Sequence, residues 1–162
     1  MASGSTVFVD AGVLLCADDG VDTAKHLRAR EWLKVLWISR CGRLSTQVLT
    51  EYYANATKKL KPPMQQGDAR AEVRRYQHWK PWQIDHQTVE TAWAIEARFQ
   101  VNWWDALIVA AAQHQGCRYV LTEGLPHEQQ IDSVQILNPF LVGPEVLEAP
   151  DPAVTTPTVS PP

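Results

Sequence analysis

Short apolar runs alternate with longer helical patterns along this chain, and this alternation limits its fold more than any other feature. Residues 7–9, 119–121 and 134–137 form apolar runs of strand length. Helical spacing of apolar residues, or a polar run bounded by helix-ending residues, predicts helices over about 23–39, 46–60, 67–79, 86–100 and 103–116. Strands that alternate with helices predict an α/β domain with a central, mostly parallel sheet.

The length and composition fit one folded domain followed by a tail. The chain has 162 residues, of which 45% are hydrophobic and 20% charged, so a single core is expected. From residue 143 onward the sequence becomes rich in Pro and Thr and poor in large apolar residues. Such a segment buries too little surface to offset its ordering entropy. We therefore predict a folded domain over 1–142 and a disordered tail over 143–162.

Cysteine usage and the N-terminus indicate a cytoplasmic protein. The three cysteines, Cys16, Cys41 and Cys117, have no metal-binding spacing, and an odd scattered set is typical of free thiols in a reducing compartment. The first ten residues lack the basic and apolar regions of a signal peptide, and no apolar run reaches 18 residues. We expect no membrane partner. The net charge of −3 means that any polyanion must be bound by a local patch.

Asp10 and Glu51 are acids in places where a carboxylate usually costs stability. Asp10 follows an apolar strand, and open α/β sheets bind ligands beyond the carboxyl ends of their strands. Capping of the next turn explains Asp10 equally well. Glu51 shares a helix face with Asn55 and Lys58, an arrangement that suits a metal, a water and a phosphate. An ordinary solvated helix face is the alternative for Glu51.

Asp105 is the third such acid. It lies in the first turn of an apolar helix, just after a possible cap at Asn102. The helix dipole favours an acid there by about 0.3–1 kcal/mol, but the two tryptophans before it point to the wall of a site. Three acids from separate segments that meet in a fold would favour a divalent metal, because a cation offsets the repulsion between carboxylates.

Two basic clusters offer local sites for phosphate. Lys58, Lys59 and Lys61 follow Glu51, and we treat them as candidate RNA-binding residues. Arg70, Arg74 and Arg75 form the second cluster, for which a solvated helix face is the default interpretation.

Taken together, four segments in order resemble a PIN domain, and more narrowly the VapC-type toxins of bacterial toxin–antitoxin modules. The segments are FVDAGVLL, RLSTQVLTEYYANATKKLKPP, WWDALIVAAAQHQGC and YVLTEGLPHEQQIDSVQILNPF. They span roughly residues 7–140. The resemblance implies a three-layer α/β/α fold with acids gathered at one end of the sheet.

The resemblance also implies a function and a set of partners. It implies a Mg²⁺- or Mn²⁺-dependent endoribonuclease, with RNA as substrate, a cognate antitoxin, and a homodimer. The family acids carry over onto Asp10, Glu51 and Asp105. The position of the fourth acid falls on Gly124, and its neighbour Glu123 is a further candidate ligand. Thr122 and Asn55 are candidates for orienting these groups.

The departures from the family pattern predict a weaker site. Ala11 and Gly12 follow Asp10 where the family has small polar residues, and Gly124 replaces an acid. We expect weak metal binding and reduced nuclease activity. The alternative is an inactive PIN-like module that only binds antitoxin or RNA. An aspartyl phosphotransferase is a third hypothesis, but Gly12 stands where that chemistry usually has a second Asp.

Overall fold

The computed structural model describes residues 5–148 of the chain. Its elements, in chain order, are β1 (Val7–Val9), α1 (Ala11–Asp18), α2 (Thr23–Ser39), β2 (Gly42–Arg43), α3 (Thr46–Ala56), α4 (Gln66–Arg75), the 3₁₀ helix η1 (Tyr76–Trp79), α5 (His86–Phe99), α6 (Trp103–His114), β3 (Tyr119–Leu121), β4 (Gln130–Ile131), β5 (Val134–Leu137) and the 3₁₀ helix η2 (Pro144–Glu148).

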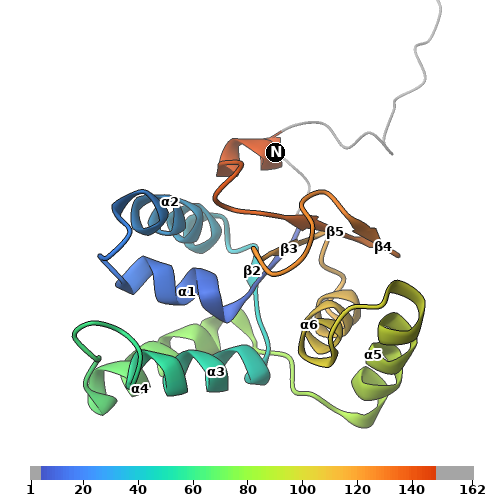
Figure 1. Ribbon diagram of the computed structural model, residues 1–162, viewed down its shortest axis with the longest axis horizontal. Helices are drawn as coiled ribbons and strands as arrows, with labels where there is room; N and C mark the ends of the chain where they lie inside the picture. Colours follow the sequence, from blue (N-terminus) through green and yellow to red (C-terminus); the bar gives the residue numbers. More distant parts are fainter. Residues whose placement is uncertain (1–4, 149–162) are drawn as a thin grey trace, which may run out of the picture.

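A five-stranded sheet forms the centre of the molecule, in the order β2-β1-β3-β5-β4. All neighbouring pairs are parallel except β4 and β5, which run antiparallel. Helices α1 to α4 gather at the left in Figure 1, while α5 and α6 form a pair at the lower right. This arrangement confirms the predicted α/β fold, with a central, mostly parallel sheet flanked by helices.

Capping side chains fix where the two helices that carry Glu51 and Asp105 begin. Ser45 Oγ accepts a hydrogen bond from the Val48 amide at the start of α3, and Asn102 Oδ1 accepts one from the Asp105 amide at the start of α6. Such caps each contribute about 1 kcal/mol to helix stability. Every residue of α6 from 106 to 112 is buried, as its all-round apolar sequence predicts.

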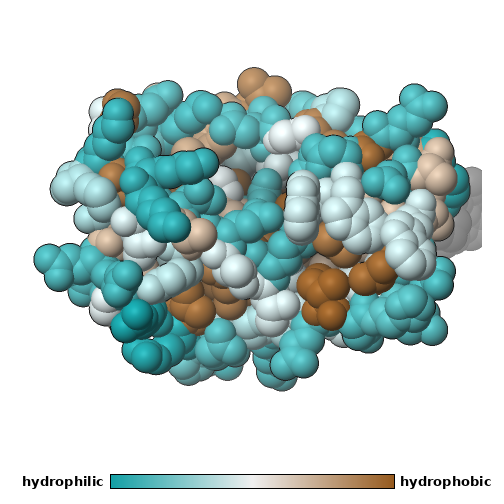
Figure 2. Space-filling model, turned by 60° about the horizontal axis from the view of Figure 1, so that its bottom comes forward, coloured by the Kyte–Doolittle hydropathy of each residue, from teal (hydrophilic) through white to brown (hydrophobic). Residues whose placement is uncertain are grey.

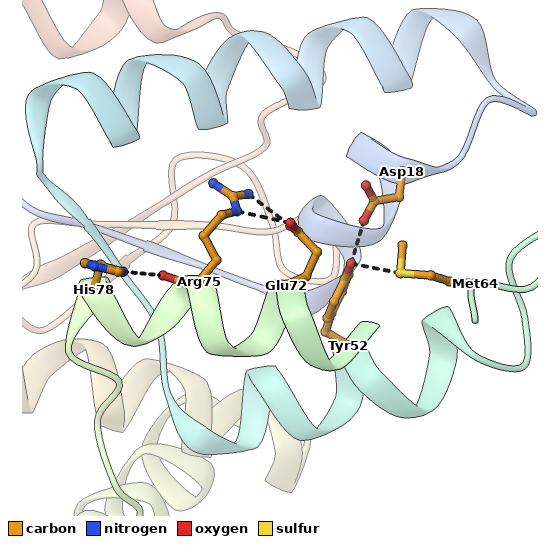
Figure 3. A network of polar contacts seen from close by, with 6 residues as sticks. All are labelled: Asp18, Tyr52, Met64, Glu72, Arg75 and His78. Atoms are coloured by element: carbon orange, nitrogen blue, oxygen red, sulfur yellow. Dashed lines mark hydrogen bonds and ion pairs between the residues drawn. The ribbon is translucent and has the colours of Figure 1, made fainter. Parts of the chain in front are cut away.

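A polar network ties α1 to α3 on the side of the molecule shown in Figure 3. The buried Tyr52 of α3 donates its hydroxyl to Asp18 Oδ2 of α1 at 2.7 Å. On α4, Glu72 forms a salt bridge with Arg75 at 2.9 Å. Because β1 leads directly into α1, the Tyr52 bond fixes α3 relative to the end of β1.

Several boundaries differ from those that the sequence predicts. The sequence does not predict α1, and α3 ends at Ala56 rather than near residue 60. The helix ends there because its last carbonyls are bonded by other groups. The Met64 amide donates to the Ala56 carbonyl, and Thr57 Oγ1 donates to the Tyr53 carbonyl. The Trp-Gln-Ile run at 82–84, which looks like a short strand in the sequence, forms only one bridge, between Ser45 and Trp82.

The sequence has Gly42 shortly after the predicted helix 23–39, where a glycine often ends a helix, but Gly42 does not end α2. Arg40 caps that helix in the left-handed conformation, and Gly42 belongs to β2. A Cβ atom at position 42 would lie 2.5 Å from the ring of Trp79. The close approach of that ring explains why the position needs a glycine.

The folded part continues past the predicted boundary at residue 142. Pro144 is buried in η2, and Val146 and Leu147 pack against the core. These apolar side chains bury enough surface to order the segment to Glu148, which the Pro- and Thr-rich composition concealed. The rest of the predicted tail, 149–162, lies outside the described residues. Cys16, Cys41 and Cys117 are free thiols, as expected.

Candidate active site

Asp10 and Thr122 lie side by side because they follow neighbouring parallel strands. The Asp10 amide bonds to the Leu121 carbonyl at 3.1 Å, which continues the pairing of β1 with β3. Thr122 Oγ1 then donates to Asp10 Oδ2 at 2.8 Å, while Asp10 Oδ1 accepts the Ala11 amide at 2.7 Å. Asp10 therefore caps α1 with one oxygen and faces Thr122 with the other.

Glu51 reaches the same region from α3. Gln47, one turn earlier on α3, donates its side-chain amide to Glu51 Oε1 at 3.2 Å. The same amide lies 3.3 Å from the Trp104 carbonyl at the start of α6. Gln47 thus joins the helix that carries Glu51 to the helix that carries Asp105.

Asp105 is held by the residue that caps its own helix. The Asn102 side-chain amide donates to Asp105 Oδ2 at 2.7 Å, while Asn102 Oδ1 accepts the Asp105 amide at 2.9 Å. This reciprocal pair fixes the direction of the carboxylate. It leaves Oδ1 of Asp105 with no hydrogen bond within the described chain.

The three acids influence one another electrically. Burial raises the pKa of each carboxyl above its ordinary value. The charges of Asp10 and Asp105 raise the pKa of Glu51 further, and the charge of Asp10 does the same to Asp105. Hydrogen bonds from Thr122, Gln47 and Asn102 act in the opposite direction. Acids that are pushed toward their neutral forms together are typical of functional sites.

Gly124 borders this group of acids. A Cβ atom at position 124 would lie 3.4 Å from Thr122 Oγ1, and 3.8 and 3.9 Å from the two carboxylate oxygens of Asp105. These are ordinary contact distances, so a side chain fits there. The Gly124 amide donates to Thr122 Oγ1 at 3.0 Å, which fixes the hydroxyl that holds Asp10.

Glu123 is engaged elsewhere. Its carboxylate forms a salt bridge with Lys25 of α2 at 2.8 Å. Its charge still raises the pKa of Asp10, so it lies near the acids. Both partners in the salt bridge are exposed, and a pair of this kind contributes little to stability.

The remaining predicted site residues lie farther out. The Asn55 side-chain amide donates to the backbone carbonyl of Glu51 at 2.9 Å, so it does not contact the Glu51 carboxylate. Lys58, Lys59 and Lys61 follow the end of α3, and all three are exposed. No contact among the described residues joins these lysines to the acids.

Sequence reasoning missed Gln47 and Lys25. Gln47 lies four residues before Glu51, so a side-chain pair on one helix face was readable from spacing. Lys25 meets Glu123 across 98 positions of sequence, and no local pattern signals such a pair.

The chemistry of the donors fits a hard divalent cation, because Mg²⁺ and Mn²⁺ prefer carboxylate oxygens. Within residues 5–148, no three His, Cys, Asp or Glu side chains stand close enough together to hold a metal ion as they are placed. Mg²⁺ needs only one or two carboxylates, with water as its other ligands. The acids therefore suit a site that is partly hydrated.

Of the three acids, Glu51 opens onto a shallow groove rather than a closed cavity. Glu51 and Trp104 both line this groove, which has a volume of about 530 Å³. A second cavity of about 300 Å³ lies beside Asp18 and Arg75, in the network of Figure 3. It contains none of the three acids, so we do not place the site there. No helix in the described part of the chain is long and apolar enough to span a membrane.

Comparisons with known proteins agree with the fold. The family model of the PIN domain matches residues 7–125. The fold is similar to that of the crystal structure of Mycobacterium tuberculosis VapC20, a sarcin-ricin loop cleaving toxin, with a TM-score of 0.56. The sequences are 22% identical, and the match covers 71% of this chain and 87% of VapC20. No curated protein matches the chain. Since the family model spans most of the described fold and all three acids, this chain belongs to the PIN-domain family.

Proposed function

We propose that this protein is a metal-dependent endoribonuclease that acts as the toxin of a type II toxin–antitoxin module. The observation that carries this proposal is that Asp10, which follows β1, lies near Glu51 of α3 and Asp105 of α6, with each pKa raised. The likeness to a toxin that cleaves RNA supports the choice of substrate.

Each residue has a role in this proposal. Asp10 and Asp105 would hold Mg²⁺ or Mn²⁺, and Glu51 would bind the same ion or orient the attacking water. When bound, the ion supplies positive charge at the phosphate and lowers the pKa of a coordinated water. Thr122 holds Asp10 in place, a role that can be worth about 10–100-fold in metal affinity.

Support around Glu51 and Asp105 comes from amide side chains. Gln47 donates to Glu51, and Asn102 donates to Asp105. Both amides keep a carboxylate oxygen oriented without adding a competing positive charge. Asn55 would act indirectly through the Glu51 backbone, and Glu123 would need to leave Lys25 to serve as a ligand. Lys58, Lys59 and Lys61 would contact the RNA backbone.

The proposed partners follow from the same likeness. A cognate antitoxin would cover the acids, and an Arg from it would suit them through a bidentate pair. We also propose that the protein forms a homodimer.

Gly124 favours a second candidate function, an inactive module that only binds antitoxin or RNA. The position of the fourth family acid carries no side chain, and the other carboxylates are not gathered into a ready metal cage. A module of this kind would keep the fold and lose the chemistry.

Cleavage of RNA separates the two candidates. Purified protein with labelled RNA should produce fragments in Mn²⁺ and none in excess EDTA. Asp105→Asn should slow cleavage by about 10²–10³-fold, the usual loss when one group that stabilises developing charge is removed. Cleavage that persists at the wild-type rate in Asp105→Asn would contradict the proposed site, and binding without any cleavage would favour the inactive module.

A further inference from the structure

Two shallow grooves meet on the exposed face of α3. The first, of about 530 Å³, runs from Glu51 past Ile84 to Trp104. The second, of about 470 Å³, lies between α3 and α4 and includes Tyr53, Arg70 and Arg74. Thr46 and Thr50 line both grooves, so the two lie side by side along α3, and together we call them the channel; Glu51 lines its first part.

Trp104 is unusually placed for a large aromatic residue. Its side chain is 61% exposed, although it lies next to the buried apolar part of α6. Its backbone carbonyl is held by Gln47, which also holds Glu51. The indole lines the same groove as Glu51 and is largely open to solvent. Exposed aromatic rings of this kind serve as stacking platforms for unpaired nucleobases.

The second groove offers positive charge for a nucleic-acid backbone. The Arg70 guanidinium lies 6.0 Å from the centre of the Tyr53 ring, at the distance of a cation–π contact. Arg70 and Arg74 are exposed, and neither forms a salt bridge within residues 5–148. Two guanidinium groups without acidic partners, next to an aromatic ring, suit a phosphate and its base.

Hydrophilic side chains surround the channel, but the channel itself has apolar walls. Figure 2 brings forward the face that is at the bottom of Figure 1, where α3 and α4 lie, and hydrophilic residues cover most of that face. Within the grooves, Ile84, Leu49 and Val73 are among the lining residues. Trp104, Arg70 and Arg74, rather than the surrounding surface, therefore favour a nucleic acid as the occupant.

We propose that this channel is the path of single-stranded RNA away from the cleavage site. An unpaired base stacks on Trp104 next to the phosphate at the acids, and the following backbone passes Thr50 to reach Arg70 and Arg74. This inference rests on the proposed function for its substrate class. It goes further in naming Trp104 as the residue that selects an unpaired base.

Binding of a fluorescein-labelled single-stranded RNA, measured by anisotropy in EDTA to prevent cleavage, tests the path. Trp104→Ala should weaken binding by about five- to a hundredfold, the range for loss of one base–aromatic stack. Trp104→Phe should restore most of the affinity. Trp93→Ala removes another exposed tryptophan, 48% exposed on α5 and outside both grooves, and should leave affinity unchanged.

Salt dependence separates the two parts of the channel. Arg70→Ala and Arg74→Ala should each reduce the slope of log Kd against log salt by about 0.7, the value for one phosphate contact on a single strand. Trp104→Ala should weaken binding at every salt concentration and leave that slope unchanged. RNA with an abasic residue at the stacked position should bind wild type and Trp104→Ala equally.

The outcomes distinguish this path from the proposed function. If wild type neither binds nor cleaves RNA, the proposed function fails and the path fails with it. If wild type cleaves RNA but Trp104→Ala and Trp93→Ala bind alike, the nuclease stands and the path is wrong. The channel would then be better explained as a surface for a protein partner.

Discussion

At the scale of one residue, Glu51 shows how bringing acids together lowers the stability of the folded protein. Its carboxyl is removed from water and lies near Asp10 and Asp105, and its pKa is raised for both reasons, burial being the larger. A raised carboxyl pKa means that the folded state prefers the protonated form. The resulting loss of stability is absent below the ordinary value of 4.5 and develops as pH rises through the raised pKa.

Glu51→Gln should therefore raise the melting temperature at pH 7, because the amide keeps the bond from Gln47 without the buried charge. Below about pH 4 the variant and wild type should melt at the same temperature, since Glu51 is then neutral in both states. Thermal unfolding followed by circular dichroism at a series of pH values measures this difference.

Glu96→Gln is the matched control, because Glu96 is an exposed glutamate on α5. It should melt like wild type across the pH range. A stabilisation by Glu51→Gln that is equal at pH 3.5 and pH 7 would show that charge is not its cause.

Gly124→Asp should restore the fourth carboxylate. The Cβ fits at contact distance from Thr122 and Asp105, so the change needs no rearrangement of the backbone. We expect Mn²⁺ affinity to rise by about tenfold or more, because a carboxylate about 4 Å from a cation contributes well over 1 kcal/mol even in a partly solvated site. Isothermal titration with Mn²⁺ measures the affinity, and RNA cleavage should accelerate in parallel.

Gly124→Asn separates charge from shape in this experiment. It introduces a side chain of the same size, and it should raise affinity much less than Gly124→Asp does. Without metal, Gly124→Asp should also lower the melting temperature, because the new carboxylate faces Asp105. Equal behaviour of the two variants would show that the missing acid does not limit the site.

The sequence could single out three acids as candidates but could not decide what each one does. For Asp10, helix capping and a role in the site were equally good explanations. The structure shows the cap, because one oxygen accepts the Ala11 amide, while the other oxygen accepts Thr122 and can still take the proposed role in the site. A carboxylate has enough acceptor positions for two roles. The partner of Glu123, by contrast, depends on a contact between distant segments.

At the scale of elements, the contact between α1 and α3 sets the distance from Asp10 to Glu51. Tyr52→Phe removes the hydroxyl that bonds Asp18 and should lower the free energy of unfolding by about 1–2 kcal/mol, as expected for a hydrogen bond to a charged group that is itself exposed. Urea unfolding measures the loss. Burial raises the pKa of Tyr52 above its ordinary value, so the hydroxyl remains a donor at neutral pH.

Tyr53→Phe serves as the comparison for this prediction. It removes the hydroxyl of the next residue, which lines the second groove between α3 and α4. The change should leave the free energy of unfolding within about 0.5 kcal/mol of wild type. Equal stability of the two variants would mean that the Tyr52 bond does not hold α1 against α3.

The helices that the sequence predicted well begin at a capping side chain. Asp85 caps α5, and Asp22 caps α2, which spans the predicted residues 23–39. The sequence did not predict α1 because nearly all of its residues are apolar. Without polar residues between them, neither the period of a helix nor that of a strand can be recognised. β4 has only two residues and is a strand because it pairs with β5. No local sequence pattern predicts that pairing.

At the scale of the whole molecule, the parallel sheet makes the site. β1 and β3 are neighbours, although more than a hundred residues separate them, and their carboxyl ends place Asp10 beside Thr122. α3 and α6 then bring Glu51 and Asp105 to the same end, where Gln47 joins the two helices. The alternation of strands and helices predicts a mostly parallel sheet, but it does not predict the order of the strands in that sheet. The closeness of the acids depends on this particular order.

The central claim is that the acid after β1 and the acids of α3 and α6 form one cation site, and titration of Mn²⁺ into the protein at pH 7 tests it most directly. We predict saturable binding by wild type, weakened by about tenfold or more in each of Asp10→Asn, Glu51→Gln and Asp105→Asn, because each removes one charge from the same site. The control Glu96→Gln should bind as wild type does. Binding of Mn²⁺ that all three variants retain at wild-type affinity would contradict the account.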